Sequence, residues 1–414
     1  METTTMSNIS KQLYELMPTA DNLSLQNSFP AAEWQLYKIR FPDLVSGEPQ
    51  VIKVDADCIS PQNSEISIPL PNGKIMSFGL DHFSQEPGGR PYWHGSIRSD
   101  RASRFPSSCE VVSDPLNKIF LSRYENRLRG EIVVEGQLYC LEFLGNDIHV
   151  LFKAEDLTSK GCSPIEEHEL AEAPPKYYPS HNEISKFRIL YIIAPSLSLV
   201  FPPQFIDDLV EAIKDCLASV NTVLRDSQVN IAYELAAFRA PAFVEDYRNE
   251  DLLIRLRDIN TPIGKQIADE RDSLGAHIVL VARLQSPPED PIYKAYQDAK
   301  KTNAFAVLGI SNYSTNVGHQ LGHLMGARHE LKPGDIPIDP GYEYPYEFPD
   351  GEYTYLTMMA KEVADVADPY YFRHYSNPRQ QYEGKPLGTV ERNDVVRRFN
   401  ERRLEVETWY PDKK

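Results

Sequence analysis

The chain has 414 residues and a formal net charge of −17, from 60 acidic against 43 basic side chains. Such an acidic chain repels a phosphate backbone, so we expect no general binding to nucleic acid. Hydrophobic residues make up 41% and charged residues 25%, which is ordinary for a soluble globular protein and argues against a disordered chain or a coiled coil. At about 150 residues per domain, this length predicts two or three domains.

No stretch of the sequence approaches the roughly 18 apolar residues that a membrane span needs, so we expect no membrane span. The first residues lack both the basic and the apolar region of a secretory signal, which predicts synthesis in the cytoplasm without a cleaved signal peptide. Export as a secreted effector by a leaderless route is compatible with this. The five cysteines are odd in number and form no disulfide framework.

The first part of the chain is β-rich in its pattern. Residues 1–30 are polar, and we expect a loosely ordered leader or a short helix there. Residues 31–155 show short apolar alternations separated by turn residues, which predict a β-rich domain. The predicted strands are 34–41, 73–80, 117–124, 131–136, 137–144 and 147–154.

The pattern changes after a polar, acidic and proline-containing segment at 156–185, which is typical of a linker. Over 186–414, strands and helices alternate, in a segment long enough to bury its own core. The predicted strands are 187–194, 229–238, 276–284 and 305–311, and the predicted helices are 203–224, 248–258 and 263–273. A histidine-rich helix is expected after the last of these strands.

The segment VGHQLGHLMGARHE, at 317–330, has the spacing of a metal site. His319 and His323 are four residues apart, which places both imidazoles on one face of a helix. Gly326 can end that helix with a positive φ, so that the chain turns and brings His329 to the same ion. Three imidazoles and one open position are typical of a catalytic Zn²⁺ site, whereas the alternative is three incidental histidines.

With these residues the chain resembles the metzincin zinc endopeptidases, whose motif is H-E-x-x-H-x-x-G-x-x-H followed by a Met-turn. It looks most similar to the bacterial reprolysin-like, or adamalysin-like, branch. Met359 in TMMA fits the Met-turn beneath the zinc, Glu330 matches an acidic residue after the third His, and 375–389 resembles the downstream segment of bacterial members. Residues 305–311 resemble the edge strand that pairs with substrate.

The resemblance covers about 186–405 and implies an α+β fold, with a metzincin-type zincin catalytic domain over 186–414. More weakly, WHGSI and the strands within 117–154 resemble the prodomain of the same proteins. The resemblance to metzincins implies a zinc-dependent metalloendopeptidase in precursor form, which hydrolyses internal peptide bonds of protein substrates with zinc-activated water. Lys361, two residues after Met359, stands where some other metzincins have Tyr, which favours the adamalysin-like branch.

Position 320 departs from the family, because Gln320 stands where metzincins have the Glu that acts as general base. An amide has no titratable proton, and loss of a general base costs about 10²- to 10⁴-fold in rate. We therefore expect this chain to bind zinc and to cleave very little. Gln320 is either a substitution that keeps a protease precursor intact or the mark of a natural pseudoprotease that binds peptides.

Cys162, in the predicted linker, suggests a cysteine switch that keeps the enzyme latent. Latent metalloproteases that this chain resembles often place a prodomain thiolate on the zinc, and cleavage between about 163 and 186 would release it. The alternative is a free linker thiol. Carboxylates that could ligate instead, or simply be solvated, are Asp156, Glu166, Glu167 and Glu169.

The resemblance also implies partners. The N-terminal domain is expected to cover the cleft or assist folding, and residues 1–160 are a candidate site for a chaperone or an immunity protein. Acidic residues within 335–352 would favour basic substrates if they face the cleft, but a proline-stiffened surface loop is the preferred interpretation. His374 is expected at the surface or beside the ligands rather than on the metal.

Overall fold

The computed structural model divides into two compact units, unit 1 at Met1–Glu155 and unit 2 at Asp156–Lys414. It describes residues 10–18, 22–46, 49–85, 89–154, 162–166, 181–246, 248–284, 293–310, 313–331, 334, 336–338, 340–350, 353–361 and 370–411. None of the described helices is long and apolar enough to cross a membrane.

Unit 1 is built on one ten-stranded sheet whose two ends meet in a single segment. The sheet order is β1-β4-β5-β6-β7-β8-β9-β10-β3-β2. Because β1 and β2 are consecutive parts of residues 11–16 and pair with β4 and β3 respectively, the sheet closes on itself as a barrel. The strands are β1 Lys11–Gln12, β2 Tyr14–Leu16, β3 Gln50–Val54, β4 Glu65–Pro69, β5 Ile75–Gln85, β6 Pro91–Ile97, β7 Lys118–Tyr124, β8 Arg127–Val134, β9 Gln137–Gly145 and β10 Ile148–Lys153.

Side chains from alternate positions of these strands fill the barrel. The core includes Trp93 and Phe78, both fully buried, together with Leu13 from the first segment. The described residues of unit 1 also form short helices: α1 Asn22–Asn27, α2 Ala31–Arg40, α3 Asp43–Ser46, η1 Ala56–Cys58 and α4 Arg101–Arg104.

Two expectations for the N-terminal part need correction. Residues 34–41 were expected to be a strand, but they fall in α2 and its C-cap. Trp34 and Tyr37 lie one helical turn apart and are both buried. The buried aromatic residues therefore have the spacing of one helix face and not the alternation of a strand. The expected loose leader contains Leu13 and Tyr14, which are 0% and 1% exposed because they close the barrel.

Unit 2 has a five-stranded sheet in the order β12-β11-β13-β15-β14. All pairs are parallel except β14 with β15. The strands are β11 Ser185–Ile193, β12 Ile231–Arg239, β13 Ile278–Ala282, β14 Lys294–Ala295 and β15 Phe305–Leu308. Residues 305–311 were expected to give an edge strand, and this is wrong, because β14 pairs with β15 and takes the edge.

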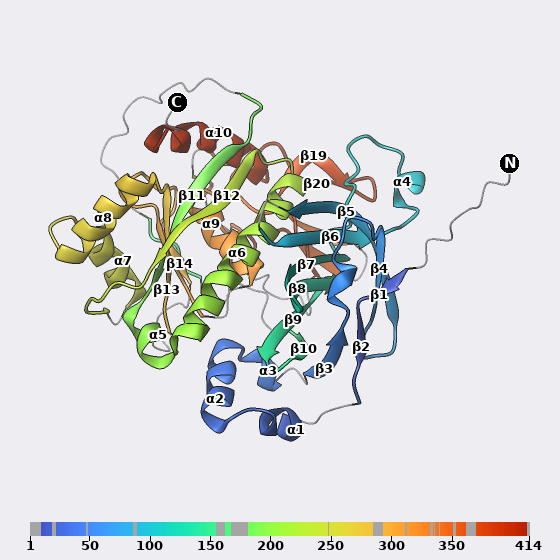
Figure 1. The fold of residues 1–414 in the computed structure, drawn as a ribbon. Helices are drawn as coiled ribbons and strands as arrows, with labels where there is room; N and C mark the ends of the chain where they lie inside the picture. The colour runs from blue at the N-terminus through green and yellow to red at the C-terminus, as the bar shows by residue number, and fades with distance from the viewer. Residues whose placement is uncertain are drawn as a thin grey trace. The chain divides into compact units, whose positions relative to one another are not determined.

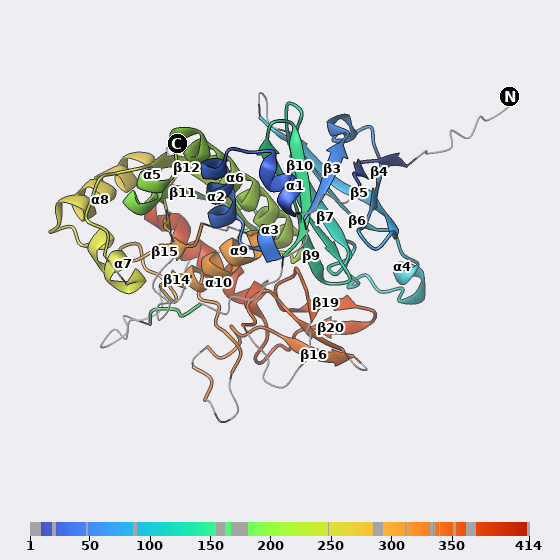
Figure 2. The same ribbon diagram turned by 90° about the horizontal axis from the view of Figure 1, so that it is seen from below.

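Helices cover both faces of this sheet. α6, at Pro203–Asp226, connects β11 to β12, and α7 and α8, at Asn249–Arg257 and Pro262–Leu274, connect β12 back to β13. Right-handed crossovers that run in opposite directions place their helices on opposite faces, and both views show α7 and α8 on the side away from α6 (Figures 1 and 2). The short helix α5 is Pro195–Val200.

The chain beyond the sheet carries α9 at Ser314–Leu324, a three-stranded sheet in the order β16-β17-β18 and the β19–β20 hairpin. These strands are β16 Glu347–Asp350, β17 Tyr353–Leu356, β18 Tyr370–Tyr371, β19 Asn377–Tyr382 and β20 Lys385–Leu387. The chain closes with α10 at Val395–Val406 and η2 at Glu407–Trp409.

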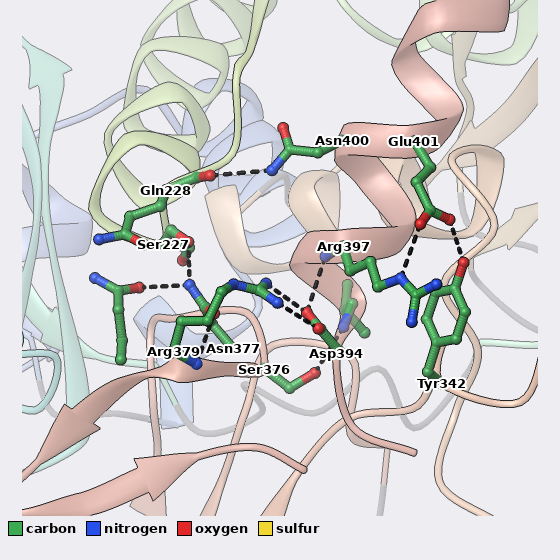
Figure 3. Close-up of polar contacts among 12 residues, drawn as sticks. Ser227, Gln228, Tyr342, Ser376, Asn377, Arg379, Asp394, Arg397, Asn400 and Glu401 are labelled. Atoms are coloured by element: carbon green, nitrogen blue, oxygen red, sulfur yellow. Dashed lines mark hydrogen bonds and ion pairs between the residues drawn. The ribbon is translucent and has the colours of Figure 1, made fainter. Parts of the chain in front are cut away.

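A polar cluster ties α10 to the β19–β20 hairpin and to the end of α6 (Figure 3). Asp394 is fully buried, caps α10 by accepting the Arg397 N–H, and forms a bidentate ion pair with Arg379. Asn377 donates to the carbonyl of Ser227 at 3.0 Å. These contacts fix the β19–β20 hairpin, which follows Met359 in the chain, against the rest of unit 2.

Candidate metal centre

Helix α9 is buried along its whole length. Its two glycines let other segments approach closely: the Tyr375 hydroxyl donates to the Gly318 carbonyl at 3.0 Å, and a Cβ on Gly322 would overlap the sulfur of Met359. The helix ends just before Gly326, which has φ +91°, a conformation that favours glycine. The chain therefore reverses here, as the sequence predicts.

The reversal brings three imidazoles together. Nε2 of His319 lies 2.9 Å from Nε2 of His329 and 3.0 Å from Nε2 of His323, and the last two are 3.0 Å apart. The sulfur of Cys162 lies 3.3 Å from Nε2 of His323. One ligand atom from each of these four residues lies within 4.8 Å of all the others.

The opposite ring nitrogens show that these contacts are not ordinary hydrogen bonds. Nδ1 of His319 lies 3.2 Å from the Met358 carbonyl, and Nδ1 of His323 lies 2.9 Å from the Ala327 carbonyl. A carbonyl only accepts, so each Nδ1 carries the proton and each Nε2 carries a lone pair. Two lone pairs at 3.0 Å repel one another unless a cation lies between them.

The environment keeps the histidines neutral, as metal binding requires. Burial lowers the pKa of His319 to about 4 and, with the nearby His319, the pKa of His329 to about 2. Burial also moves the pKa of His323 well below its usual value. Three neutral imidazoles and a thiol are the donor set that suits Zn²⁺, so the residues fit this metal.

Second contacts hold the ligands in place. The amide oxygen of Gln297 lies 3.1 Å from Nδ1 of His323, and its amide nitrogen donates to the Ala327 carbonyl at 3.1 Å. The Glu330 carboxylate accepts the Lys361 N–H at 2.8 Å, which joins the chain after His329 to the chain after Met359. Met359 is buried against α9, where the sequence places the Met-turn.

The segment at 162–166 lies along the edge strand of unit 2. Cys162 and Ile165 form parallel bridges with Tyr293 and Tyr296, on either side of β14. Ile165 N–H donates to the Ala295 carbonyl, and the Ile165 carbonyl accepts the Gln297 N–H, both at 2.8 Å.

The ends of this segment are also fixed. The Glu166 carboxylate pairs with Arg328 at 2.6 Å, and Arg328 also pairs with the buried Glu343. Cys162 is 1% exposed, and burial raises the pKa of its thiol to about 12. The thiol therefore does not lie free in a solvated linker.

Gln320 lies in the same pocket. It is fully buried, and its amide nitrogen donates to the Cys162 sulfur at 3.2 Å. Its oxygen has no partner among the described residues. A Glu at this position would place a carboxylate where the amide now donates to sulfur.

The remaining sequence candidates lie elsewhere. Asp156, Glu167 and Glu169 are outside the described residues, as is part of 335–352. Glu343 is buried and pairs with Arg328. His374 is 1% exposed and is not in the metal group; its carbonyl accepts the Met358 N–H.

Two functional features were missed in the sequence. Gln297 and the edge strand β14 lie in a short segment, YKAYQ at 293–297, that follows residues outside the described ranges and has no marked periodicity. No pattern in this segment marks that strand, and nothing in the sequence near Gln297 indicates a contact with His323.

Comparison with known proteins supports a metalloprotease. No family model matches the chain. It is 24% identical over 363 residues to a peptidyl-Asp metalloendopeptidase of Stenotrophomonas maltophilia strain R551-3, with 84% of this chain and 83% of that protein covered. A protein of the same name from Xanthomonas campestris pv. campestris is 23% identical, with 84% and 82% covered.

Two solved structures show weaker likeness. One, described as a chaperone-substrate complex, has a TM-score of 0.43 and 12% identity, covering 68% of this chain and 40% of that one. The other, metalloproteinase-II from Bacteroides fragilis, has a TM-score of 0.36 and 13% identity, covering 66% and 84%. TM-scores this low do not establish a common fold.

Proposed function

We propose that the chain is the precursor of a zinc-dependent metalloendopeptidase of the metzincin type, similar to bacterial reprolysins. The observation that carries the proposal is the convergence of the Nε2 atoms of His319, His323 and His329, two of them fixed as lone-pair donors by carbonyls on Nδ1. Zinc bound there would polarise the substrate carbonyl and lower the pKa of a water molecule.

The chain's own residues divide the remaining work. His319, His323 and His329 hold the metal, and Met359 packs beneath the helix that carries the first two. The residue at 320 faces the same pocket, where a Glu would accept a proton from the attacking water and return it to the leaving amine. Gln320 cannot do so, and this form is therefore inactive.

Cys162 is proposed as the fourth ligand of the latent form. Its sulfur already lies against His323, and the segment 162–166 occupies the edge strand that an extended substrate would use. Cleavage between about 163 and 186 would cut the chain that joins Cys162 to unit 2, so that Cys162 would be held there by non-covalent contacts and by the metal.

Unit 1 is proposed as the prodomain, which covers the cleft or assists folding. Unit 2 makes up less than two thirds of the chain, so a match over 84% of the chain extends into unit 1 as well. A chaperone or immunity protein that binds 1–160, and a role as an exported effector, are proposed from the sequence alone.

The substrate class follows from the relatives' name. We propose that the active form cleaves protein chains at peptide bonds next to Asp. The second candidate function is a natural pseudoprotease, a zinc-containing module that binds peptides, and Gln320 is the observation that favours it.

One pair of proteins separates these functions. This chain and its Gln320→Glu variant are loaded with equal zinc and incubated alone and with casein, and intact mass is measured. We expect the Glu form to clip itself between 163 and 186 and to degrade casein, while the Gln form does neither. A Gln320→Glu, His323→Ala double variant is the control. If the Gln320 chain and its Gln320→Glu variant each bind one zinc and neither cleaves a protein, the enzyme proposal is rejected in favour of the pseudoprotease.

A further inference from the structure

Arg328, the residue before His329, holds two carboxylates beside the metal site. Its Nη1 lies 2.6 Å from the Glu166 carboxylate, and its Nε lies 3.2 Å from the Glu343 carboxylate. The two contacts use different N–H groups of one planar guanidinium. The Glu343 carbonyl also accepts the Arg328 N–H at 2.9 Å, so Arg328 is fixed by Glu343 through both its backbone and its side chain. Arg328 therefore takes a second carboxylate although Glu343 already pairs with it.

The two carboxylates differ in their exposure to solvent. The Glu343 side chain is 3% exposed, whereas that of Glu166 is 39% exposed and that of Arg328 is 18% exposed. Glu343 thus belongs to the interior of unit 2, and the place that Glu166 occupies is open to solvent on one side. An acidic side chain of another peptide can reach the same nitrogen of Arg328 without displacing Glu343.

Glu166 reaches Arg328 because the segment 162–166 lies extended along the edge strand β14. Alternate residues of an extended chain point to one face, so Cys162 and Glu166 point to the same face. Their contacts agree with this, because the Cys162 sulfur lies 3.3 Å from Nε2 of His323 while the Glu166 carboxylate contacts Arg328. At about 3.3 Å per residue, these two anchoring residues are about 13 Å apart along the segment.

We propose that Arg328 is a specificity-determining residue that binds an acidic side chain of the substrate, about four residues from the scissile bond. In the latent form, Glu166 occupies the position of that acidic residue. A peptide can pair with the edge of β14 in either direction, so the acidic residue lies on one side of the scissile bond, and matched peptides identify which side. The inference rests on the proposed endopeptidase and adds a subsite away from the reacting atoms.

The first test uses the full chain with Gln320→Glu and matched peptides that contain one cleavage site. The peptides carry Glu, Gln or Lys at the third, fourth or fifth residue before or after the scissile bond, and they are otherwise identical. We expect kcat/KM of the best Glu peptide to exceed that of its Gln partner about 3- to 10-fold, on one side of the bond only, as suits a partly exposed charged pair. Lys should be disfavoured there. Arg328→Met should remove the preference, and Arg328→Lys should keep part of it.

Arg239→Met is the matched control. Arg239 also forms a partly exposed ion pair, with Glu270 at 2.7 Å, but it lies on β12, at the opposite edge of the sheet from β14. This variant should keep the preference for Glu. Because Arg328 adjoins His329, bound zinc is measured in every variant, and Arg328→Lys takes the place of Arg328→Met if the Met variant binds less zinc.

The second test needs no cleavage and uses the zinc-loaded Gln320 chain. The rate at which iodoacetamide labels Cys162, located by peptide mass spectrometry, measures how firmly the segment 162–166 is held. Glu166→Gln and Arg328→Met should each raise this rate about 3- to 10-fold. The double variant should raise the rate no further, since both changes remove the same ion pair.

The outcomes separate the two proposals. If the Gln320→Glu chain cuts no peptide, the endopeptidase fails, and the labelling of Cys162 alone judges whether Arg328 binds an acidic side chain. If the chain cuts without preference for Glu, or if Arg328→Met keeps the preference, Arg328 is not a substrate subsite, whatever the labelling shows. If the effects of Glu166→Gln and Arg328→Met on labelling multiply in the double variant, the two residues act independently and the proposed carboxylate site is rejected.

Discussion

His149 of unit 1 and the pair His319 and His323 of unit 2 are buried in different surroundings. In unit 1, His149 is 4% exposed, and its Nε2 accepts the Leu128 N–H at 3.0 Å. In unit 2, Nε2 of His319 and Nε2 of His323 face one another at the same distance, while their protons point to carbonyls. Both arrangements lower the histidine pKa by burial. What marks a site is therefore the convergence of lone pairs, and burial by itself does not.

The largest effect should come from breaking that convergence. In the Gln320→Glu protein, His323→Ala removes the central ligand, and we expect bound zinc to fall well below one per chain and peptide hydrolysis to fall at least about 10³-fold. Zinc is measured by mass spectrometry and hydrolysis with casein. His149→Gln is the matched control and should keep one zinc. Full zinc occupancy in His323→Ala would contradict the site.

Removing a buried unit 2 side chain that has its own hydrogen-bond partners should lower stability without changing zinc binding. Asp394 caps α10 and pairs with Arg379 (Figure 3). Asp394→Ala loses the cap and leaves its partners unpaired, so we expect unit 2 to lose about 3 kcal/mol of unfolding free energy. Asp394→Asn keeps the capping oxygen and should lose less. Urea unfolding measures both, and an unchanged zinc content in the folded protein separates stability from metal binding.

An intermediate effect is expected from Gln297, which contacts His323 without being a ligand. Gln297→Leu removes its oxygen from Nδ1 of His323 and its donor from the Ala327 carbonyl. Such outer contacts are worth about 10- to 100-fold in metal affinity. Competition with a zinc chelator measures this. Gln380→Leu, at another buried amide that donates to the Asp226 carbonyl, should leave zinc affinity unchanged.

The sequence predicts most of what is local. The four-residue spacing of His319 and His323, and the glycine that turns the chain towards His329, are encoded within eleven residues. The predicted strands within 73–154 correspond to β5 and to β7 through β10, because alternation with turn residues marks them clearly. The predicted helix 203–224 corresponds to α6, whose apolar face is continuous.

What the sequence could not supply is contact over distance. Cys162 reaches His323 across 161 residues, and Gln297 reaches it from a turn. Arg373 donates to the Ser314 hydroxyl of α9, from which it is 59 residues distant in the chain. Residues 34–41 were predicted as a strand because aromatic residues favour strands, whereas their helical spacing becomes evident only from the packing. Spacing locates ligands that are close in sequence, whereas topology alone assembles the groups around them.

The smallest effect tests the satisfied histidine of unit 1. Burial lowers the pKa of His149 to about 4, with Arg129 lowering it further and Asp147 raising it. Between pH 6.5 and 4, His149 is protonated in the unfolded chain and neutral in the folded chain. The free energy of unfolding should therefore fall as the pH falls through this window, and His149 should not affect it above the window. We expect a loss of about 1.5 kcal/mol, allowing for partial solvent screening.

The measurement is urea unfolding in a Trp409→Phe background, which leaves fluorescence to Trp34 and Trp93 of unit 1. His149→Gln keeps an acceptor for the Leu128 N–H but cannot titrate, so its stability should change less over the same window. If both proteins lose stability equally, His149 is not the group responsible. If only the protein that retains His149 loses stability, a backbone donor and burial are enough to keep a histidine neutral without a metal. Burial and a low pKa then do not identify a metal site, and the convergence of Nε2 atoms in unit 2 remains the feature that does.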